Sequence, residues 1–301
     1  MTNYQNSPKK ILLLGKNGQV GWELQRTLSP LGDIIALGRE DLDLIQAGDI
    51  RRTVQEIRPD IIVNAAAYTA VDRAEKEAGL AMAINGDAPG VLAEEAKKQG
   101  SLLVHYSTDY VFDGTKDSPY TEEDKPNPLN VYGKTKLAGE RAIQGVDGNY
   151  LVFRTSWVYG TRGQNFFLTI LRLARERDEI KVVDDQIGAP TWCRMIAEAT
   201  ALILAQGINR DEGFQGYFEK KKGIYHMTAG GQTSWYEFAK QIILNNPLFT
   251  KGLNVKIIPI KSEDYNNIAK RPRYSVLKNS LVKLPEWKLS LKLVCSKEQN
   301  P

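Results

Sequence analysis

Three glycines spaced three residues apart, Gly15, Gly18 and Gly21, are the feature that most restricts how this 301-residue chain folds. They follow a short apolar run at residues 11–14 and precede a segment whose apolar residues recur at helical spacing. Glycines let such a turn close tightly and let a pyrophosphate approach the backbone N–H groups at the start of the helix. The motif therefore predicts a dinucleotide-binding turn, with an ordinary strand-to-helix turn as the alternative.

Apolar runs alternate with amphipathic segments through the first half of the chain. Near-continuous apolar strands are typical of parallel sheets, and strands that alternate with helices predict βαβ units. The fold class expected is α/β, a Rossmann-type doubly wound parallel sheet with a smaller C-terminal substrate-binding lobe. After the glycine loop, the expected strands cover residues 33–38, 60–67, 101–108 and 150–156, and the expected helices cover 49–59, 78–100 and 131–144.

Beyond residue 160 the alternation becomes irregular. We expect a Rossmann domain that binds the dinucleotide over residues 1-160, with a return segment near 182-206. Residues 161-181 and 207-301 are expected to form the smaller, partly discontinuous substrate-binding lobe. The polar, charged stretch 206–222 is the most linker-like part of the sequence.

Composition excludes several classes of protein. A net charge of +4 is too small to imply a nucleic-acid surface, and no apolar run approaches the roughly 20 residues of a membrane span. The polar start, "MTNYQNSPKK", is not expected to be a signal peptide. Two distant cysteines predict free thiols and a cytoplasmic location, and two histidines are too few for a His-rich metal site.

The end of the second expected strand, "LGRED", bears on the choice of dinucleotide. An acidic residue there would bind the ribose 2′-hydroxyl of NAD, but Gly38 stands at this position and Arg39 follows. Because a guanidinium can pair with a 2′-phosphate, the sequence favours NADPH. Asp41 and Asp43 lie near enough to leave NADH open, and a solvated Arg39 is the alternative.

Four Tyr-x3-Lys pairs place a phenol and an ammonium on one helix face if they are helical. A free phenol has a pKa of about 10, and a nearby ammonium favours the phenolate and lowers that pKa. Only Tyr132/Lys136 starts the helix that follows the fourth expected strand, where Ser107 and Thr108 end that strand and offer hydroxyls to a carbonyl. A structural pair on a surface helix is the alternative. The pairs are Tyr132/Lys136, Tyr217/Lys221, Tyr236/Lys240 and Tyr274/Lys278.

The glycine motif, "NAAAYT", "STDYVFDG" and "YGKTK" together resemble an extended short-chain dehydrogenase/reductase. More narrowly, the chain resembles the dTDP-4-dehydrorhamnose reductases. The similarity is nearly continuous from residue 10 to about residue 195 and weaker through "GIYHMTAGG" and "RPRYSVL". The blocks that carry this narrower resemblance are "GKNGQVGWEL", "NAAAYTAVDRAE", "STDYVFDG", "PLNVYGKTKLAGE", "FRTSWVYG" and "DDQIGAPT".

The resemblance implies NADPH-dependent reduction of the C4 ketone of dTDP-4-dehydro-6-deoxy-L-mannose to dTDP-L-rhamnose, for polysaccharide biosynthesis. Tyr132 would deliver the proton, Lys136 would tune that phenol and hold the nicotinamide ribose, and Thr108 would bind the C4 oxygen. Asp109 and Trp157 match positions that contact the sugar. Gly15, Gly21 and Arg39 would contact the cofactor, as the motifs above indicate. By the resemblance, the other residues that line the cofactor would be Gly18, Gln19, Val20, Asp43, Leu44, Ala67, Tyr68, Thr69, Tyr106, Tyr132 and Lys136.

Some of these assignments have alternatives. Trp157 is equally suited to a core between the two lobes, and Asp109 to capping its loop. Arg273, with Arg271 in "RPR", could bind the substrate diphosphate or be a solvated tail charge.

Departures from related sequences narrow the function further. Nucleotide-sugar dehydratases of this superfamily carry Asp-Glu after the threonine, whereas Tyr110 stands in place of the glutamate here, which favours plain reduction. Some relatives form a homodimer through Mg²⁺; Glu23 matches one ligand, but Arg194 is a poor neighbour for a dication, so we predict no metal and leave a homodimer open. The alternative functions are those of a non-catalytic NADP-binding regulatory subunit of the same fold and of a reductase or epimerase of another nucleotide sugar.

Overall fold

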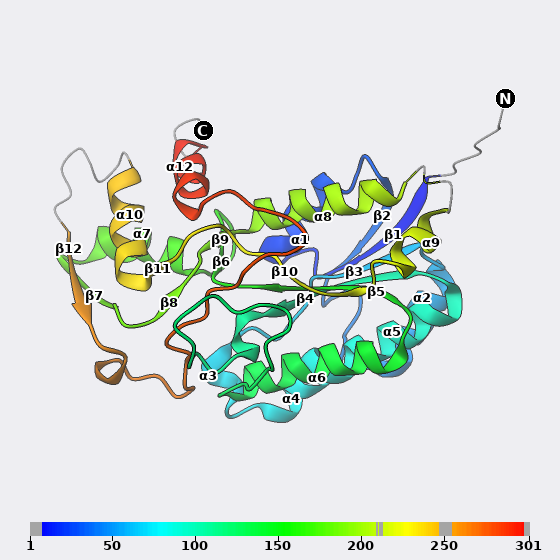
Figure 1. Cartoon of the computed structure of the whole chain (residues 1–301), viewed down its shortest axis with the longest axis horizontal. Helices are drawn as coiled ribbons and strands as arrows, with labels where there is room; N and C mark the ends of the chain where they lie inside the picture. Colours follow the sequence, from blue (N-terminus) through cyan, green and yellow to red (C-terminus); the bar gives the residue numbers. More distant parts are fainter. Residues whose placement is uncertain (1–7, 209, 211–212, 247–254, 298–301) are drawn as a thin grey trace.

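A six-stranded, all-parallel sheet forms the centre of the computed structural model, which describes residues 8–208, 210, 213–246 and 255–297 (Figure 1). Residues 1–7, where no signal peptide is expected, lie outside this range. The strand order β10-β5-β4-β3-β1-β2 reverses direction at the β1/β3 boundary, as in doubly wound folds, so the expected fold class is confirmed. The strands are β1 (Lys9–Leu14), β2 (Gly32–Leu37), β3 (Ile61–Asn64), β4 (Leu102–Thr108), β5 (Asn149–Thr155) and β10 (Gly223–His226).

Helices cover both faces of this sheet because successive strand residues point to opposite sides. In β1, Ile11 and Leu13 join one apolar core, and Leu12 and Leu14 join the other. In Figure 1 the helices that pack on Leu12 and Leu14 lie below the sheet, and α8, on the opposite face, lies above it. On one face lie α1 (Gln19–Thr27), α8 (Cys193–Gly207) and α9 (Gly213–Glu219); on the other lie α2 (Ala47–Ile57), α5 (Ala88–Gln99) and α6 (Val131–Val146).

The segment expected to be one helix over 78–100 contains a π-helical turn. It consists of α4 (Ala78–Met82), the π-turn η1 (Ala83–Asp87) and α5, and it ends at Gly100, whose φ of 68° lies in the left-handed region. The π-turn directs the buried Asn85 toward the loop after β3, which includes the short helix α3 (Val71–Ala74).

The prediction that residues 206–222 form a linker is wrong. Helix α8 continues to Gly207, and α9 buries Phe214, Tyr217 and Phe218 against the main core. The strand that follows, β10, pairs in parallel with β5, so α9 packs on the six-stranded sheet and β10 belongs to it, and neither lies in the smaller lobe. The charged residues of this stretch conceal an apolar face at helical spacing, which explains the error. The rest of the division into lobes stays a prediction.

The remaining elements form a second layer with its own apolar core, on the left in Figure 1. Strand β7 (Glu179–Val183) pairs in parallel with β12 (Lys256–Ile260), and α10 (Trp235–Asn245) packs on α7 (Phe166–Glu176). No helix within the described residues is long and apolar enough to cross a membrane. The other elements are β6 (Val158–Tyr159), β8 (Ile187–Gly188), β9 (Thr191–Trp192), β11 (Thr233–Ser234), α12 (Trp287–Lys297), and the 3-10 turns η2 (Asp109–Val111) and η3 (Ser262–Asp264).

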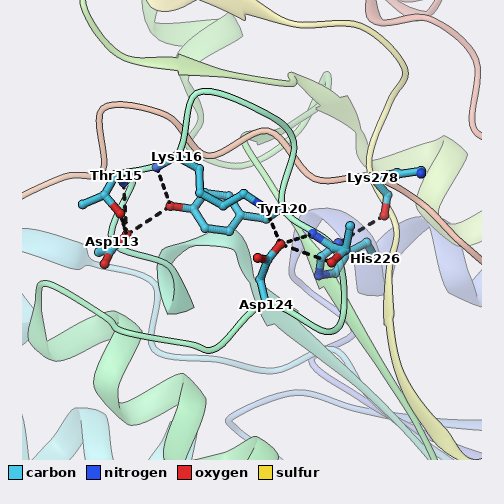
Figure 2. A network of polar contacts seen from close by, with 8 residues as sticks. Asp113, Thr115, Lys116, Tyr120, Asp124, His226 and Lys278 are labelled. Atoms are coloured by element: carbon cyan, nitrogen blue, oxygen red, sulfur yellow. Dashed lines mark hydrogen bonds and ion pairs between the residues drawn. The ribbon is translucent and has the colours of Figure 1, made fainter.

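The loop between β4 and α6 is tied to itself and to the C-terminal tail by the polar network in Figure 2. The Tyr120 hydroxyl donates to Asp113 at 3.1 Å, and Lys116 pairs with Asp124 at 2.7 Å. On the other side of the network, the Lys278 N–H of the tail donates to the Tyr120 carbonyl at 2.8 Å, and the Lys278 carbonyl oxygen lies 3.2 Å from Nδ1 of His226. These contacts hold the loop that delivers the chain to the start of α6.

A buried ion pair fixes α6 to the sheet. Arg154 of β5 donates from Nε and Nη2 to the two carboxylate oxygens of Glu140 on α6, at 2.9 and 2.7 Å, and both side chains are almost completely buried. The Ser107 hydroxyl of β4 donates to the same carboxylate at 2.5 Å. One carboxylate thus joins a helix to two neighbouring strands at their carboxyl ends.

Replacing one partner of this pair should strongly destabilise the protein, because it leaves a buried charge unpaired. We expect Arg154→Met to lower the free energy of unfolding by about 3–5 kcal/mol, measured by urea denaturation. The double variant Glu140→Met/Arg154→Met should recover much of that loss. Arg172→Ala, which breaks the exposed Arg172–Glu176 pair, is the matched control, with an expected loss of about 0.5 kcal/mol. Equal losses of unfolding free energy for Arg154→Met and Arg172→Ala would contradict the conclusion that Arg154 and Glu140 form a buried ion pair.

Candidate active site

The glycine loop connects β1 to α1 at the carboxyl edge of the sheet. Gly15 has φ of 84°, and its N–H donates to the Leu37 carbonyl at 2.9 Å. A Cβ on Gly21 would lie 2.0 Å from the Gly15 carbonyl oxygen, so the helix approaches the loop as closely as a missing side chain allows. Gly18 caps α1 with no side chain over the first N–H groups, which fits an anionic diphosphate. Gln19 and Val20 open the first turn.

At the end of β2 the acidic residues are already engaged. Asp41 accepts the Gly38 N–H at 2.8 Å and the Lys16 ammonium at 2.5 Å, and these two contacts, in that order, lower the pKa of its carboxyl. Asp43 accepts the N–H of Ile45 at 3.2 Å within its own loop. Arg39 is exposed beside them and remains the cation suited to a phosphate, while the neighbouring Leu44 is buried.

The loop after β3, Ala67 to Thr69, is held by the π-turn. Tyr68 donates its N–H to Oδ1 of Asn85 at 2.9 Å, and its carbonyl accepts from Nδ2 of the same residue at 3.0 Å. The Tyr68 hydroxyl donates to Glu77 at 2.5 Å. These contacts keep the loop at the carboxyl edge, where a ligand of such a sheet binds.

Helix α6 brings Tyr132 to Thr108. Asn130 caps the helix by accepting the Gly133 N–H at 2.8 Å, which places Tyr132 in the first turn. The phenol lies beside the Thr108 side chain, and the Tyr110 ring packs edge-on at 5.8 Å. Burial raises the pKa of Tyr132 to about 12, and the nearby Thr108 hydroxyl opposes this. The phenol is therefore protonated at neutral pH, in contrast to the lowered pKa expected from Lys136 alone.

Lys136 lies one turn further along α6 and is buried. Its Nζ donates to the Tyr106 carbonyl at 2.6 Å and lies 3.1 Å from Nε2 of His105. Burial lowers the pKa of this ammonium to about 8, against the opposing charge of Glu140. The Tyr106 side chain points to the other face of the sheet, where its hydroxyl meets Thr200 at 2.8 Å. Tyr106 thus contributes its carbonyl to this site.

Asp109 is a buried carboxyl with one open oxygen. Oδ1 accepts the Thr108 hydroxyl at 3.1 Å, whereas Oδ2 has no hydrogen-bond partner among the described residues. Burial raises the pKa of this carboxyl to about 7, and the nearby hydroxyls of Ser275 and Thr108 oppose this shift. An orphaned buried oxygen next to Thr108 fits a hydroxyl group of a ligand.

Trp157 is held in an unusual backbone conformation by ring stacking. Its φ is 46°, in the left-handed region that bulky residues rarely adopt. The ring stacks on Trp235 of α10 with centroids 3.4 Å apart and planes 4° apart. A Cβ on Gly188 would lie 2.4 Å from the Trp157 ring, so only glycine leaves room there. The paired rings form a flat apolar surface between the end of β5 and the second layer.

The two tail arginines differ in their surroundings. Arg271 pairs with Asp72 of α3 at 2.8 Å, and Asp72 also accepts the N–H groups of Ile268 and Ala269. Arg271 is thus engaged in holding the tail against α3. Arg273 is exposed, and its carbonyl accepts the Ile187 N–H at 2.8 Å, which leaves its guanidinium as the tail cation suited to a diphosphate.

Comparisons with known proteins identify the family. The family profile described as RmlD substrate binding domain matches residues 9–300. The dTDP-4-dehydrorhamnose reductase of Burkholderia thailandensis is 48% identical over 297 residues, covering 94% of this chain and 97% of that protein. The chain belongs to the dTDP-4-dehydrorhamnose reductase family. The enzyme of that name from Escherichia coli K12 is 44% identical over 94% of this chain and 95% of its own.

Solved structures of the family have the same fold. The dTDP-4-dehydrorhamnose reductase of Bacillus anthracis in complex with NADP matches with a TM-score of 0.87 and 35% identity, over 96% of this chain and 99% of that one. This dTDP-4-dehydrorhamnose reductase family member is therefore an NAD(P)H-dependent oxidoreductase, and the resemblance expected from its motifs is confirmed. The roles of individual site residues stay predictions.

Sequence reasoning missed several residues that complete the site. His105 and Asn64 lie beneath Lys136, Trp235 covers one face of Trp157, and Ser275 reaches Asp109. One signal was available: two-residue alternation along β4 puts His105 and Ser107 on the same side. Trp235 and Ser275 come from distant parts of the chain and carry no local signal. Arg194, the residue that made a metal ion unexpected at this position, pairs with Glu198 at 2.7 Å.

A methyl group at residue 21 should damage the glycine loop. Because the added Cβ would overlap the Gly15 carbonyl oxygen, we expect Gly21→Ala to weaken NADPH binding by at least about tenfold, measured by fluorescence titration. Gly145→Ala is the matched control, since that glycine lies in α6 with open space around it. Equal affinity of both variants would show that the loop does not contact the dinucleotide.

Asp109 should give stability an unusual pH dependence. Its pKa rises from 3.8 to about 7 on folding, so the native state binds the extra proton between these values. Its contribution to stability therefore falls as pH rises from about 4 to about 7. We expect urea denaturation to show Asp109→Asn gaining stability relative to wild type between pH 5 and pH 7.5.

Asp113→Asn is the control for this experiment. Burial of Asp113 is outweighed by hydrogen bonds from Asn127 and Thr115, which hold the pKa of its carboxyl at about 2. Its stabilising effect is lost only as pH falls below about 4, so the difference between Asp113→Asn and wild type should stay constant from pH 5 to pH 7.5. Parallel behaviour of the two variants would rule out a raised pKa for Asp109.

Proposed function

We propose that this protein reduces the C4 ketone of dTDP-4-dehydro-6-deoxy-L-mannose to dTDP-L-rhamnose with NADPH, as a step toward polysaccharides. The observation that carries the proposal is the convergence of three groups at the carboxyl end of β4. The Tyr132 phenol and the Thr108 side chain are close enough for the Thr108 hydroxyl to oppose the rise in the pKa of the phenol, and Lys136 lies one turn behind the phenol. The glycine loop ends β1 at the same edge of the sheet.

When bound, NADPH supplies the hydride that C4 receives. The hydroxyls of Thr108 and Tyr132 are placed to bind the ketone oxygen together, and Tyr132 gives its proton to the alkoxide that develops there. The raised pKa of Tyr132 keeps the phenol protonated until the alkoxide forms. Lys136 holds the nicotinamide ribose with the N–H that Tyr106 and His105 leave free.

The surrounding residues suit a nucleotide sugar. The open oxygen of Asp109 accepts a sugar hydroxyl next to the reacting carbon. The stacked rings of Trp157 and Trp235 offer an apolar surface to the sugar or the thymine ring. Arg273 is the exposed cation that pairs with the diphosphate.

Support for NADPH comes from the end of β2. The carboxylate of Asp41 is paired with Lys16 and therefore does not repel a 2′-phosphate. Arg39 is exposed beside it. The relative from Bacillus anthracis was solved with NADP. NADH remains a second cofactor to test in the same assay. A metal-free homodimer and a cytoplasmic location stay predictions.

Replacing the phenol should stop the reaction. We expect Tyr132→Phe to lower kcat by at least about a hundredfold, because the general acid is lost while the ring is kept. The measurement follows NADPH absorbance with the dTDP-keto sugar generated in situ. Tyr236→Phe is the matched control: Tyr236 belongs to another Tyr-x3-Lys pair, whose Lys240 bonds Glu237 on the surface of α10. Wild-type kcat in Tyr132→Phe would overturn the assignment, and NADPH binding without any turnover would favour the regulatory alternative.

A further inference from the structure

The carboxylate of Glu40 fills the space next to Gly38, the residue that directly follows β2. A Cβ built on Gly38 would lie 2.4 and 2.5 Å from the two carboxylate oxygens of Glu40 and 2.6 Å from its carboxyl carbon. In dinucleotide-binding folds an acidic side chain at the end of this strand accepts the 2′-hydroxyl of the adenosine ribose. Glu40 therefore brings a carboxylate to the position where the sequence has only a glycine.

Two residues of the glycine loop hold Glu40 in this position. Nδ2 of Asn17 donates to Oε1 of Glu40 at 3.0 Å, and Nζ of Lys16 lies 3.3 Å from the same oxygen. The N–H of its own backbone and the Asn17 amide, in that order, lower the pKa of this carboxyl, so Glu40 is ionised at neutral pH. A carboxylate has about four acceptor positions, so Glu40 still has room to accept from a ribose hydroxyl.

Lys16 has two carboxylate partners and holds them unequally. Its Nζ lies 2.5 Å from Oδ2 of Asp41, an oxygen that also accepts the Gly38 N–H at 2.8 Å. The contact with Glu40 is longer, at 3.3 Å, and the Glu40 side chain is 57% exposed, against 36% for Asp41. An ammonium has three donors, so Lys16 can keep Asp41 and turn the donor that now faces Glu40 toward a phosphate.

We propose that Glu40 selects between the two dinucleotides. Next to Gly38, its carboxylate accepts the ribose 2′-hydroxyl of NADH. When it turns toward solvent, it leaves Lys16 and the exposed Arg39 to bind the 2′-phosphate of NADPH. The protein therefore uses both dinucleotides, and Glu40 sets the ratio of their affinities. In its choice of ligand the proposal rests on the proposed function, but no part of it involves the sugar.

Charge explains why one side chain can set this ratio. A phosphate monoester carries about two negative charges at neutral pH, so it is repelled by a carboxylate that a hydroxyl would hydrogen-bond. Moving Glu40 away costs little, because its contact with Lys16 is an exposed ion pair. In exchange the phosphate gains an ammonium and the guanidinium of Arg39, which can bind two phosphate oxygens at once. Binding of NADPH therefore includes the displacement of Glu40, whereas binding of NADH keeps it in place.

Replacing Glu40 by its uncharged analogue should shift the ratio toward NADPH. We expect Glu40→Gln to bind NADPH more tightly and NADH more weakly, so that the ratio of the two Kd values changes by at least about tenfold. The measurement is a fluorescence titration of the protein with each dinucleotide, without any sugar. Glu56→Gln, at an exposed glutamate of α2, is the matched control and should leave both Kd values unchanged. An unchanged ratio in Glu40→Gln would overturn the proposal.

Lys16→Gln separates a phosphate-binding role from a structural one. We expect the Kd values of NADPH and of adenosine 2′,5′-bisphosphate to rise by at least about tenfold, with those of NADH and AMP changed by less than about twofold. A lysine that only ties the glycine loop to β2 would affect all four ligands alike. Equal weakening of the four would therefore contradict the assignment of Lys16 to the 2′-phosphate.

The wild-type titrations are themselves a test. Kd values for NADPH and NADH that differ by more than about a hundredfold would contradict the use of both dinucleotides. Failure of the wild-type protein to reduce the dTDP-keto sugar would instead count against the proposed function. The two failures are distinguishable, because the titrations report on the adenosine end of the dinucleotide and contain no sugar.

Discussion

The contact between α6 and the carboxyl halves of β4 and β5 determines the geometry of the whole site. His105 and Ser107 on β4 point toward α6, where His105 contacts Lys136 and Ser107 contacts Glu140. Apolar packing tolerates small slips of a helix, whereas buried hydrogen bonds and ion pairs have fixed lengths and directions. These polar contacts therefore set the rotation of α6 and its position along the strand. Because Tyr132 lies on the same face one turn earlier, the same contacts place its phenol against Thr108.

Burial also determines the charge state of the site. It raises the pKa of Tyr132 to about 12 and that of Asp109 to about 7, and it lowers that of Lys136 to about 8. All three shifts favour the neutral form of the group. Permanent positive charge is kept at the rim, where Arg39 and Arg273 are exposed. Under the proposed function, exposed cations of this kind attract the diphosphate, while the buried groups offer uncharged donors to an oxygen that becomes negative during the reaction.

Those parts of the fold that depend on local patterns could be predicted from the sequence. The glycine loop, the buried strands and the helix that starts at residue 131 each carry their signal within a few residues, and the structure bears them out. What failed depended on contacts between distant segments. The charged stretch at 206–222 hides α9, whose apolar face is meaningful only against the sheet, and the partner of Trp157 comes from α10. The position of the Glu40 carboxylate beside Gly38 likewise requires coordinates, because sequence gives residue types and not the atoms that face one another.

The stacked tryptophans show how the smaller layer is coupled to the sheet. Trp157 follows β5 directly, and its positive φ is unfavourable for a bulky side chain unless the surroundings compensate. Here the compensation comes from Trp235 on one side of the ring and from the space left by Gly188. Since Trp235 belongs to α10 and Gly188 to β8, the backbone at the end of β5 keeps its conformation only while the second layer stays in place. The stacked rings and the end of β5 therefore keep their positions together. A substitution in α10 that unstacked the rings would relax Trp157 and disturb the site from a distance.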